Sequence, residues 1–166
     1  MNKIKRALIS VWDKTDIIKL AQFLIENEIE IYSTGGTKKI LEKNNINVTS
    51  ISDITKQSEI MDGRVKTLHP RIFGGILADR KNEQHILDLN TLSAKFIDLV
   101  IVNLYPFKTE AVDKDLTFSK AIEFIDIGGP SMLRAAAKNY VNVISLCDHS
   151  QYQNFINLFK KNKGIF

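Results

Sequence analysis

The sequence predicts a single α/β domain built on a mainly parallel β-sheet. Residues 7–11 and 96–102 are nearly continuous apolar runs, which is typical of strands that are buried on both faces. Residues 17–24 carry apolar side chains at offsets 0, 3, 4 and 7, which form one buried face of a helix. The chain has 166 residues, 44% of them hydrophobic, and this suits one domain with a substantial core. Strands that alternate with helices favour a parallel sheet covered by helices.

The remaining elements continue this alternation. Further strands are expected at residues 29–32, 48–51 and 141–147, and an extended segment around a glycine pair is expected at residues 72–78. Further helices are expected at residues 38–43, 83–89, 118–124, 131–139 and 152–159. No repeat, low-complexity stretch or linker interrupts the order, so one domain over residues 1–166 is predicted.

Composition limits the classes of partner. The net charge of +4 and the pI of about 9.1 are compatible with an anionic small substrate. The basic residues do not form a stripe with aromatic residues between them, and the clearest lysine cluster, within residues 160–163, suits the C-terminal end of a helix. No role in binding nucleic acid is therefore predicted.

Cellular location is inferred from the single cysteine and from the short apolar runs. Cys147 has no second cysteine for an internal disulfide, which is typical of proteins in a reducing compartment. The apolar run that follows the basic N-terminal residues ends at Asp13, too soon for a signal segment or a membrane span. We therefore expect a cytoplasmic protein that does not contact a membrane.

The most informative segment is residues 62–70, Asp-Gly-Arg-Val-Lys-Thr-Leu-His-Pro, which fits neither a helical nor a strand pattern. Arg64 and Lys66 are two residues apart, so in an extended segment they would face one ligand together. Thr67 and His69 add a hydroxyl and a proton-handling group. The alternative is an ordinary solvated loop.

Residues 33–37, Ser-Thr-Gly-Gly-Thr, form a second candidate site. A glycine-rich turn between a strand and a helix offers backbone N–H groups and the helix N-terminus to an anion, and its hydroxyls add donors. The spacing matches neither a Walker loop nor a dinucleotide fingerprint, which argues against NTP hydrolysis and NAD binding. The alternative is a plain strand-to-helix turn.

A third candidate is residues 126–130, Asp-Ile-Gly-Gly-Pro, which open a helix that continues through Arg134 and Lys138. These two cations are four residues apart and share a helix face, where they repel one another by ~0.2–0.5 kcal/mol unless an anion lies between them. We expect Asp126 and the two cations to converge on one end of the helix. The alternative is that both cations point into water.

Asn103 and Tyr105 follow the apolar strand 96–102, at a carboxyl strand end, where parallel sheets place ligands. A tyrosine at such a position can instead be a packing residue. The three histidines have no metal-ligand spacing, so no zinc site is predicted. The chain also has no Gly-x-Ser-x-Gly elbow for a hydrolase nucleophile.

Taken in order, these segments closely resemble the IMP cyclohydrolase domain of the bifunctional AICAR transformylase/IMP cyclohydrolase family of purine biosynthesis. The resemblance rests on six motifs: residues 10–15 (Ser-Val-Trp-Asp-Lys-Thr), 33–37, 62–70, 103–107 (Asn-Leu-Tyr-Pro-Phe), 126–130 and 134–139 (Arg-Ala-Ala-Ala-Lys-Asn). It implies a methylglyoxal-synthase-like, three-layer α/β fold and a homodimer. It also implies ring closure of formyl-AICAR to IMP with loss of water, the last step of de novo purine synthesis, with no metal or other cofactor.

The resemblance also implies roles for individual residues. The implied catalytic residues are Lys66, Tyr105, Asp126 and Lys138. The implied substrate-binding residues are Ser10, Trp12, Lys14, Ser33, Thr34, Gly35, Gly36, Arg64, Thr67, Asn103, Ile127 and Gly128.

A mechanism can be hypothesised from these roles. The turn at residues 33–36 would hold the 5′-phosphate with Lys14. Lys66 and Tyr105 would polarise the formyl oxygen, while Asp126 and Lys138 handle the amide proton. Arg64 and Arg134 would lower the proton affinity of the lysines as like-charged neighbours.

The sequence departs from the family pattern in two ways. Trp12 stands where the family usually has a serine, so only its backbone is expected to contact a ligand. The family's domain normally continues further and then joins a transformylase domain, so we expect a chain truncated at its C-terminus, whose parent protein also transfers the formyl group. The competing hypothesis is a non-catalytic regulatory module of the same fold that binds a nucleotide or phosphate. Such a module has no need for Lys66, Asp126 and Lys138 together.

Overall fold

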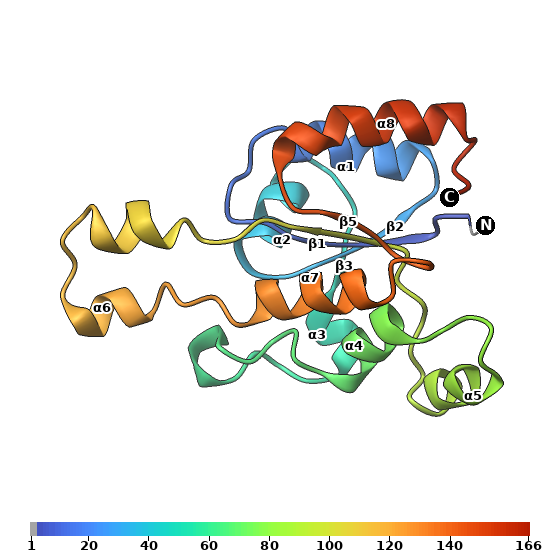
Figure 1. Cartoon of the computed structure of the whole chain (residues 1–166), viewed down its shortest axis with the longest axis horizontal. Helices are drawn as coiled ribbons and strands as arrows, with labels where there is room; N and C mark the ends of the chain where they lie inside the picture. Colours follow the sequence, from blue (N-terminus) through green and yellow to red (C-terminus); the bar gives the residue numbers. More distant parts are fainter. Residues whose placement is uncertain (1–2) are drawn as a thin grey trace.

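A computed structural model of the protein describes residues 3–166 and has one sheet of five strands, all paired in parallel, in the order β3-β2-β1-β4-β5 (Figure 1). The strands are β1 (Arg6–Ser10), β2 (Glu30–Ser33), β3 (Thr49–Ser50), β4 (Leu99–Val102) and β5 (Ile144–Leu146). This confirms the predicted α/β class with a parallel sheet. The chain runs outward from the central β1 to β3 and then crosses to β4 and β5 on the other side.

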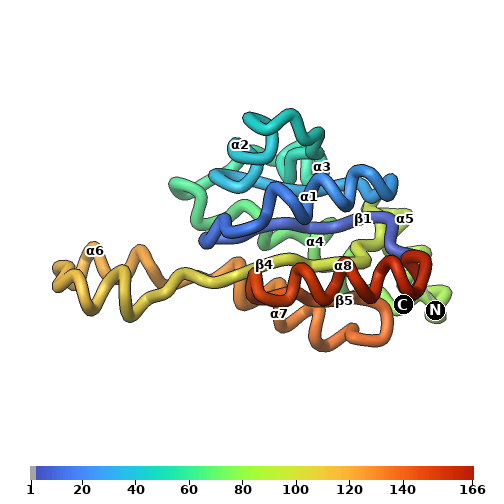
Figure 2. The backbone as a smooth tube through the Cα atoms, turned by 90° about the horizontal axis from the view of Figure 1, so that it is seen from above, coloured from blue at the N-terminus to red at the C-terminus, as the bar shows by residue number. Residues whose placement is uncertain are grey.

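Helices cover both faces of the sheet and make the fold three-layered (Figures 1 and 2). One face carries α1 (Ile17–Glu26), α2 (Gly35–Lys43) and α8 (Tyr152–Lys161). The opposite face carries α3 (Ile51–Thr55), α4 (Pro70–Leu77) and α7 (Gly128–Lys138), and α5 (Glu83–Thr91) packs against α4. Short 3₁₀ turns lie at Met61–Gly63 and His149–Gln151.

Two hydrophobic cores follow from the alternation of side chains along β1. Ala7 and Ile9 enter the core beneath α1 and α8, while Leu8 enters the core beneath α4 and α7. All three side chains are fully buried. The central strand is therefore apolar along its middle because both of its faces are covered.

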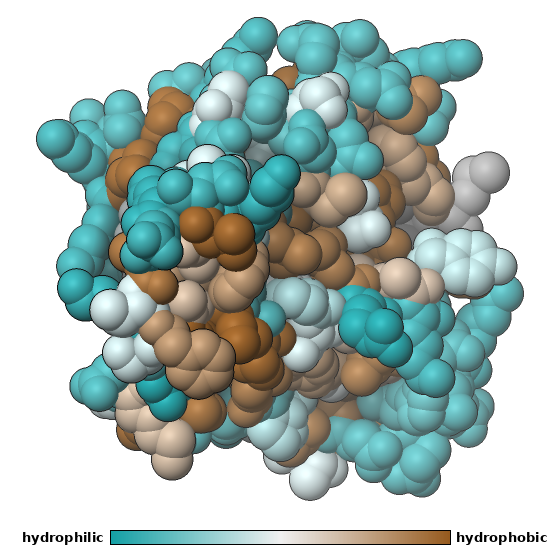
Figure 3. Space-filling model, turned by 60° about the vertical axis from the view of Figure 1, so that its left-hand side comes forward, coloured by the Kyte–Doolittle hydropathy of each residue, from teal (hydrophilic) through white to brown (hydrophobic). Residues whose placement is uncertain are grey.

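A long excursion between β4 and α7, residues 103–127, projects from the body and is called the arm below (Figures 1 and 2). It holds a short π-helical segment, Lys108–Val112, and α6 (Phe118–Ile122). Several of its apolar side chains are exposed, with Phe118 at 82%. Apolar side chains also gather on the face of the molecule that is turned forward in Figure 3.

The expectation of an extended segment at residues 72–78 is wrong, because α4 occupies Pro70–Leu77. Pro70 sits in the first turn, and the His69 ring accepts the backbone N–H of Arg71 and caps the helix. A Cβ on Gly75 would lie 2.5 Å from the backbone oxygen of Lys95. The glycine pair therefore serves close packing of α4 and not a strand bulge.

Other predicted elements differ at their ends. Helix α2 begins at Gly35 and so includes the glycine pair that was expected to precede it. Strands β3 and β5 are shorter than expected, and Val141 is exposed. Lys160 and Lys161 lie in the last turn of α8, as predicted. Within residues 3–166, no helix is both long and apolar enough to cross a bilayer.

A buried carboxylate ties the amino ends of β1 and β4 together. One oxygen of Asp98 accepts the backbone N–H groups of Lys5 and Arg6, each at 2.8 Å. The other oxygen pairs with the Arg80 guanidinium, which also lies over the Phe96 ring at 4.9 Å. Because the Asp98 side chain is only 4% exposed, water cannot replace these contacts without opening the sheet edge.

Replacing Asp98 with alanine should destabilise the fold by ~3–5 kcal/mol, since the guanidinium and two N–H groups would lose their partner in a buried site. Urea unfolding followed by circular dichroism measures the change. A matched control is Lys95→Ala, which removes a more exposed ion pair with Glu30 at 3.6 Å and should cost at most about 1 kcal/mol. Equal losses in the two variants would contradict the assignment.

Candidate active site

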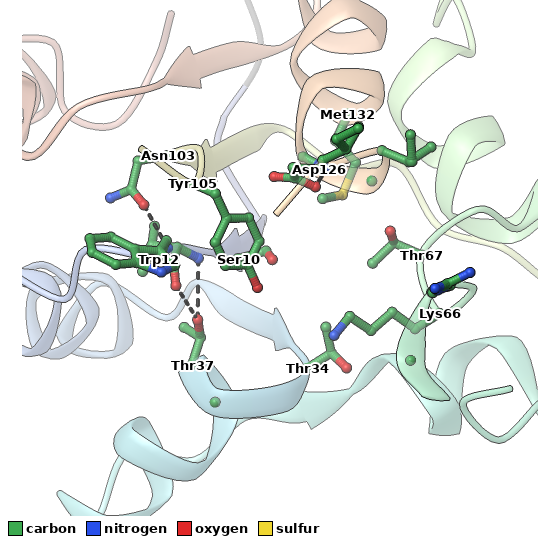
Figure 4. Close-up of a pocket in the computed structure, with 18 of the residues that line it drawn as sticks. Ser10, Trp12, Thr34, Thr37, Lys66, Thr67, Asn103, Tyr105, Asp126 and Met132 are labelled. Atoms are coloured by element: carbon green, nitrogen blue, oxygen red, sulfur yellow. Dashed lines mark hydrogen bonds between the residues drawn. The ribbon is translucent and has the colours of Figure 1, made fainter. Parts of the chain in front are cut away.

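A cavity of about 510 Å³ opens at the carboxyl ends of β1, β2 and β4 (Figure 4). Most of the predicted site residues line it: Ser10, Trp12, Lys14, Thr34, Gly36, Arg64, Lys66, Thr67, Asn103, Tyr105, Asp126, Ile127 and Gly128. Three do not: Ser33, Gly35 and Lys138. Segments far apart in the sequence thus meet at the point where the strand order reverses direction, which is where open α/β sheets bind ligands.

The loop after β1 is fixed by two side chains. The Thr37 hydroxyl donates to the carbonyl of Val11 at 3.0 Å and accepts its N–H at 3.2 Å. The Asn103 side chain accepts the N–H groups of Trp12 and Asp13 at 2.6 and 3.0 Å and donates to the Asp13 carbonyl at 2.9 Å (Figure 4). Asn103 therefore joins the start of the arm to the β1 loop as well as lining the cavity.

Lys14 places an ammonium group beside this loop. It donates to the carbonyl of Val11 and, at 2.9 Å, to that of Trp12. Burial lowers the pKa of Lys14, and the nearby carboxylate of Asp13 opposes this in part. Trp12 gives its N–H to Asn103, and its carbonyl accepts a hydrogen bond from Lys14. That carbonyl can accept a second hydrogen bond, so the expected backbone contact with a ligand stays a prediction, and Trp12 lines the cavity.

The turn at residues 33–37 presents a helix N-terminus to the cavity and not a row of free hydroxyls. The Ser33 side chain is fully buried and donates to the Ile9 carbonyl at 2.9 Å. The Thr34 hydroxyl donates to Glu59 at 2.7 Å. Gly35 has a φ of +54°, which L side chains rarely adopt, and Gly36 lines the cavity. The first amides of α2 have no intrahelical acceptor, so they are suited to an anion.

Lys66 crosses the cavity toward this helix start (Figure 4). A Cβ built on Gly35 would lie 3.4 Å from its ammonium nitrogen. The ammonium and the positive end of α2 therefore lie on the same side of the cavity, an arrangement that favours an anion between them. The side chain reaches there from a turn and not from an extended segment, because Arg64 has helical φ and ψ of −65° and −27°.

Asp126 and the glycine pair that follows form the opposite wall. One Asp126 oxygen accepts the N–H of Gly129 at 3.0 Å. A Cβ on Gly129 would lie 2.4 Å from the other oxygen, and one on Gly128 would lie 2.9 Å from the hydroxyl of buried Thr67. Both glycines are therefore required by close approach of side chains. Ile127 is exposed at the same wall.

The Tyr105 ring stands between two other aromatic rings. Its centroid is 6.4 Å from that of Trp12 and 6.2 Å from that of Phe124, both in edge-on geometry. Such contacts stabilise one ring orientation by roughly 0.5–1.5 kcal/mol each beyond area burial. Tyr105 is 43% exposed, so a ligand in the cavity can reach its phenol.

The expected convergence of Asp126, Arg134 and Lys138 is wrong within this chain. Asp126 precedes the first turn of α7, whereas Lys138 is its last residue. With a rise of about 1.5 Å per residue, Lys138 lies ~15 Å along the axis from the start of that helix. Both cations are exposed and neither lines the cavity.

Sequence reasoning did not single out several residues that line the cavity or support it. Thr37 belongs to the predicted turn at residues 33–37 but was given no role of its own, and Met132, an apolar residue of α7 that lines the cavity, gave no signal of a ligand site. Glu59 and Glu123 lie far from their partners in the sequence and gave no local signal. Across the described residues 3–166, no group of three or more His, Cys, Asp or Glu side chains could hold a metal ion.

The sequence was compared with known protein families, and the result agrees with the fold described above. Residues 16–131 match the model of the MGS-like domain. The chain belongs to the MGS-like domain family. The family assignment therefore confirms the fold that the sequence motifs had implied.

Named relatives are similar over almost the whole chain. The Bifunctional purine biosynthesis protein PurH of Clostridium botulinum (strain Loch Maree / Type A3) is 53% identical over 98% of this chain and 32% of its own length. That of Macrococcus caseolyticus (strain JCSC5402) is 54% identical over 95% of this chain and 32% of its own length. The chain thus spans about a third of the length of these relatives. The crystal structure of ForH superposes with a TM-score of 0.83 at 34% identity, over 98% of this chain and 83% of that one.

The two glycine pairs at the cavity should respond differently to alanine. A methyl group on Gly129 must displace the Asp126 carboxylate, so Gly129→Ala should destabilise the protein by ~1–3 kcal/mol. Gly36 has nothing within 4 Å of a built Cβ, and Gly36→Ala should be neutral or stabilising by up to about 1 kcal/mol. Urea unfolding of both variants provides the measurement. A well-tolerated Gly129→Ala would show that the contact with Asp126 is not tight.

Proposed function

We propose that this chain is an IMP cyclohydrolase, which closes the second ring of formyl-AICAR to give IMP and water. One observation carries the proposal. A single cavity is lined by the start of α2, which is suited to an anion, by the Lys66 ammonium and, on its other walls, by a carboxylate and a phenol. Relatives at 53% and 54% identity named as purine biosynthesis proteins support the same assignment.

The reaction needs position and charge stabilisation more than a strong nucleophile. The carboxamide nitrogen attacks the formyl carbon of the same molecule, and one of its protons passes to the formyl oxygen. The resulting hydroxyl then leaves as water with the proton of the formamido nitrogen. Holding the two groups together can supply ~7–11 kcal/mol of the barrier reduction. The remainder comes from proton transfer and from stabilising charge on the formyl oxygen.

The cavity offers a group for each of these tasks. The α2 N-terminus and Lys14 are suited to the 5′-phosphate. Lys66 and the Tyr105 phenol are suited to the formyl oxygen, since both are donors on the cavity wall. Asp126 uses one oxygen to accept the Gly129 N–H, which orients the other for the amide proton.

A non-catalytic nucleotide sensor is the second hypothesis. The groups that line the cavity distinguish it from cyclisation. Both functions need the anion site at α2, but only cyclisation needs a proton acceptor and a phenol across from it. Asp126 and Tyr105 line the same cavity as Lys66. This arrangement favours cyclisation over a sensor.

Further parts of the proposal concern the protein's assembly and location. We propose a homodimer, and the exposed apolar side chains of the arm, such as Phe118 and Val112, are compatible with a protein contact. We propose a cytoplasmic location, with which the exposed, unpaired Cys147 is compatible. Formyl transfer is proposed only for a longer parent protein of the kind that the PurH relatives represent.

Incubating the chain with formyl-AICAR should produce IMP, measured by absorbance, and the variants should separate binding from catalysis. Lys66→Ala should lower kcat by at least roughly a hundredfold. Asp126→Asn and Tyr105→Phe should lower kcat with little change in affinity for IMP, because their charge interactions develop during ring closure. Unchanged kcat in all three would favour the sensor.

Lys138→Ala tests the role that the family resemblance implies for this residue. If kcat falls as far as it does in Lys66→Ala, Lys138 must act at the cavity of a second copy of the chain, because it does not line the cavity of its own chain. An unchanged kcat would remove it from the mechanism.

The anion site at α2 has its own test. Gly36→Val adds a branched side chain where the first amides of α2 face the cavity, so IMP binding by calorimetry should weaken at least roughly tenfold, the equivalent of about 1.4 kcal/mol. Gly36→Ala is the matched control and should lose less affinity. Wild-type affinity in a folded Gly36→Val variant would place the phosphate elsewhere.

A further inference from the structure

An ion pair joins two separate segments at the edge of the cavity. The Arg64 guanidinium donates to the Glu123 carboxylate, and both residues line the cavity. Arg64 belongs to the loop that carries Lys66, whereas Glu123 is the residue that follows α6 on the arm. Their side chains are 65% and 54% exposed, so the pair lies at the solvent side of the cavity.

The Arg64 side of this contact is held by a tightly turned loop. Met61, Asp62 and Gly63 all have positive φ, at 54°, 54° and 83°. An antiparallel bridge between Ile60 and Val65 closes the loop, with N···O distances of 3.3 and 3.4 Å. The backbone of Arg64 is therefore held in place, and its guanidinium can change partner by rotation about the side-chain bonds.

The Glu123 side is held by the arm. Phe124, the next residue, packs edge-on against the Tyr105 ring at 6.2 Å. The returning segment of the arm thus contacts a cation and an aromatic ring of the cavity with two consecutive residues.

We propose that Glu123 is a positioning residue that holds Arg64 at the cavity mouth in the free protein and releases it to the anionic nucleotide on binding. This inference rests on the proposed function, because the ligand is the same purine monophosphate. It adds a residue that acts through Arg64 and sets the apparent affinity of the site.

The strength of the pair suits reversible exchange. An exposed ion pair is weak, since water and salt compete for both partners. Glu123 accepts one hydrogen bond from Arg64, whereas an arginine can bind a phosphate through two parallel charge-assisted hydrogen bonds. Arg64 lines the same cavity as Lys14 and Gly36, where the proposed function places the 5′-phosphate, so the released guanidinium would add a cation to that phosphate. The ligand therefore displaces Glu123, and the free energy of the lost ion pair is subtracted from the binding free energy.

The experiment measures IMP binding by calorimetry in Glu123→Gln, which keeps the shape of the side chain and removes its charge. Because the competitor is lost, IMP should bind about two- to fivefold tighter. The KM for formyl-AICAR should fall by the same factor while kcat is unchanged. In an Arg64→Ala background, Glu123→Gln should have no effect, because the residue through which it acts is absent.

Two controls isolate the charge at the mouth. Glu110→Gln removes a carboxylate from another ion pair of the arm, with Lys114 at 2.5 Å, and neither residue lines the cavity. It should leave IMP affinity unchanged. Inosine lacks the phosphate, and its affinity should not differ between wild type and Glu123→Gln.

The outcomes separate this inference from the proposed function. If IMP binds wild type but binds Glu123→Gln equally well or more weakly, the inference about Glu123 is overturned and the proposed function is not. The same holds if the gain persists in the Arg64→Ala background or with inosine. If IMP does not bind wild type at all, the proposed function fails and the inference fails with it.

Discussion

The parallel pairing of β1 with both β2 and β4 is the constraint on which the rest of the structure depends. Its register aligns Ile9 with Ser33 and Ser10 with Val102, so three strands end at nearly the same level. A strand rises about 3.3 Å per residue, and a slip of one residue would also turn each side chain to the opposite core. The cavity exists because the loops after these three strands start side by side and then diverge.

Many polar groups around the cavity bind one another and hold its shape. The hydroxyls of Ser33 and Thr37 and the amide of Asn103 are all bonded to backbone groups of β1 or of the loop after it. The groups left for the proposed ligand are charged side chains, the Tyr105 phenol and the start of α2. Groups fixed before binding lower the entropy that binding would otherwise cost, and they would keep the reacting atoms aligned for the proposed intramolecular reaction.

The three glycine pairs illustrate how one sequence feature has different physical causes. Gly35 is needed for its positive φ at a helix start, and Gly75 for the approach of α4 to the Lys95 carbonyl. Gly129 is needed because the Asp126 carboxylate occupies the position of a side chain. The first and third causes lie within a few residues of the glycine, whereas the contact of Gly75 with Lys95 joins residues that are far apart in the sequence and depends on how α4 packs.

Sequence alone determined the alternation of strands and helices and the parallel sheet, because apolar periodicity and strand-to-helix turns are local properties. Most of the residues that meet at the cavity were expected because the sequence motifs resemble a known family, and the structure brings them together. Sequence reasoning gave the wrong conformation for residues 72–78, where the packing of Gly75 against Lys95 favours a helix. Sequence reasoning also predicted that Lys138 lies near Asp126, although the two residues lie at opposite ends of α7. The partners of Arg64 and Thr34 were decided only by the tertiary structure, since Glu123 and Glu59 are 59 and 25 residues away. Contacts at such separations depend on how whole elements pack, and no local pattern encodes them.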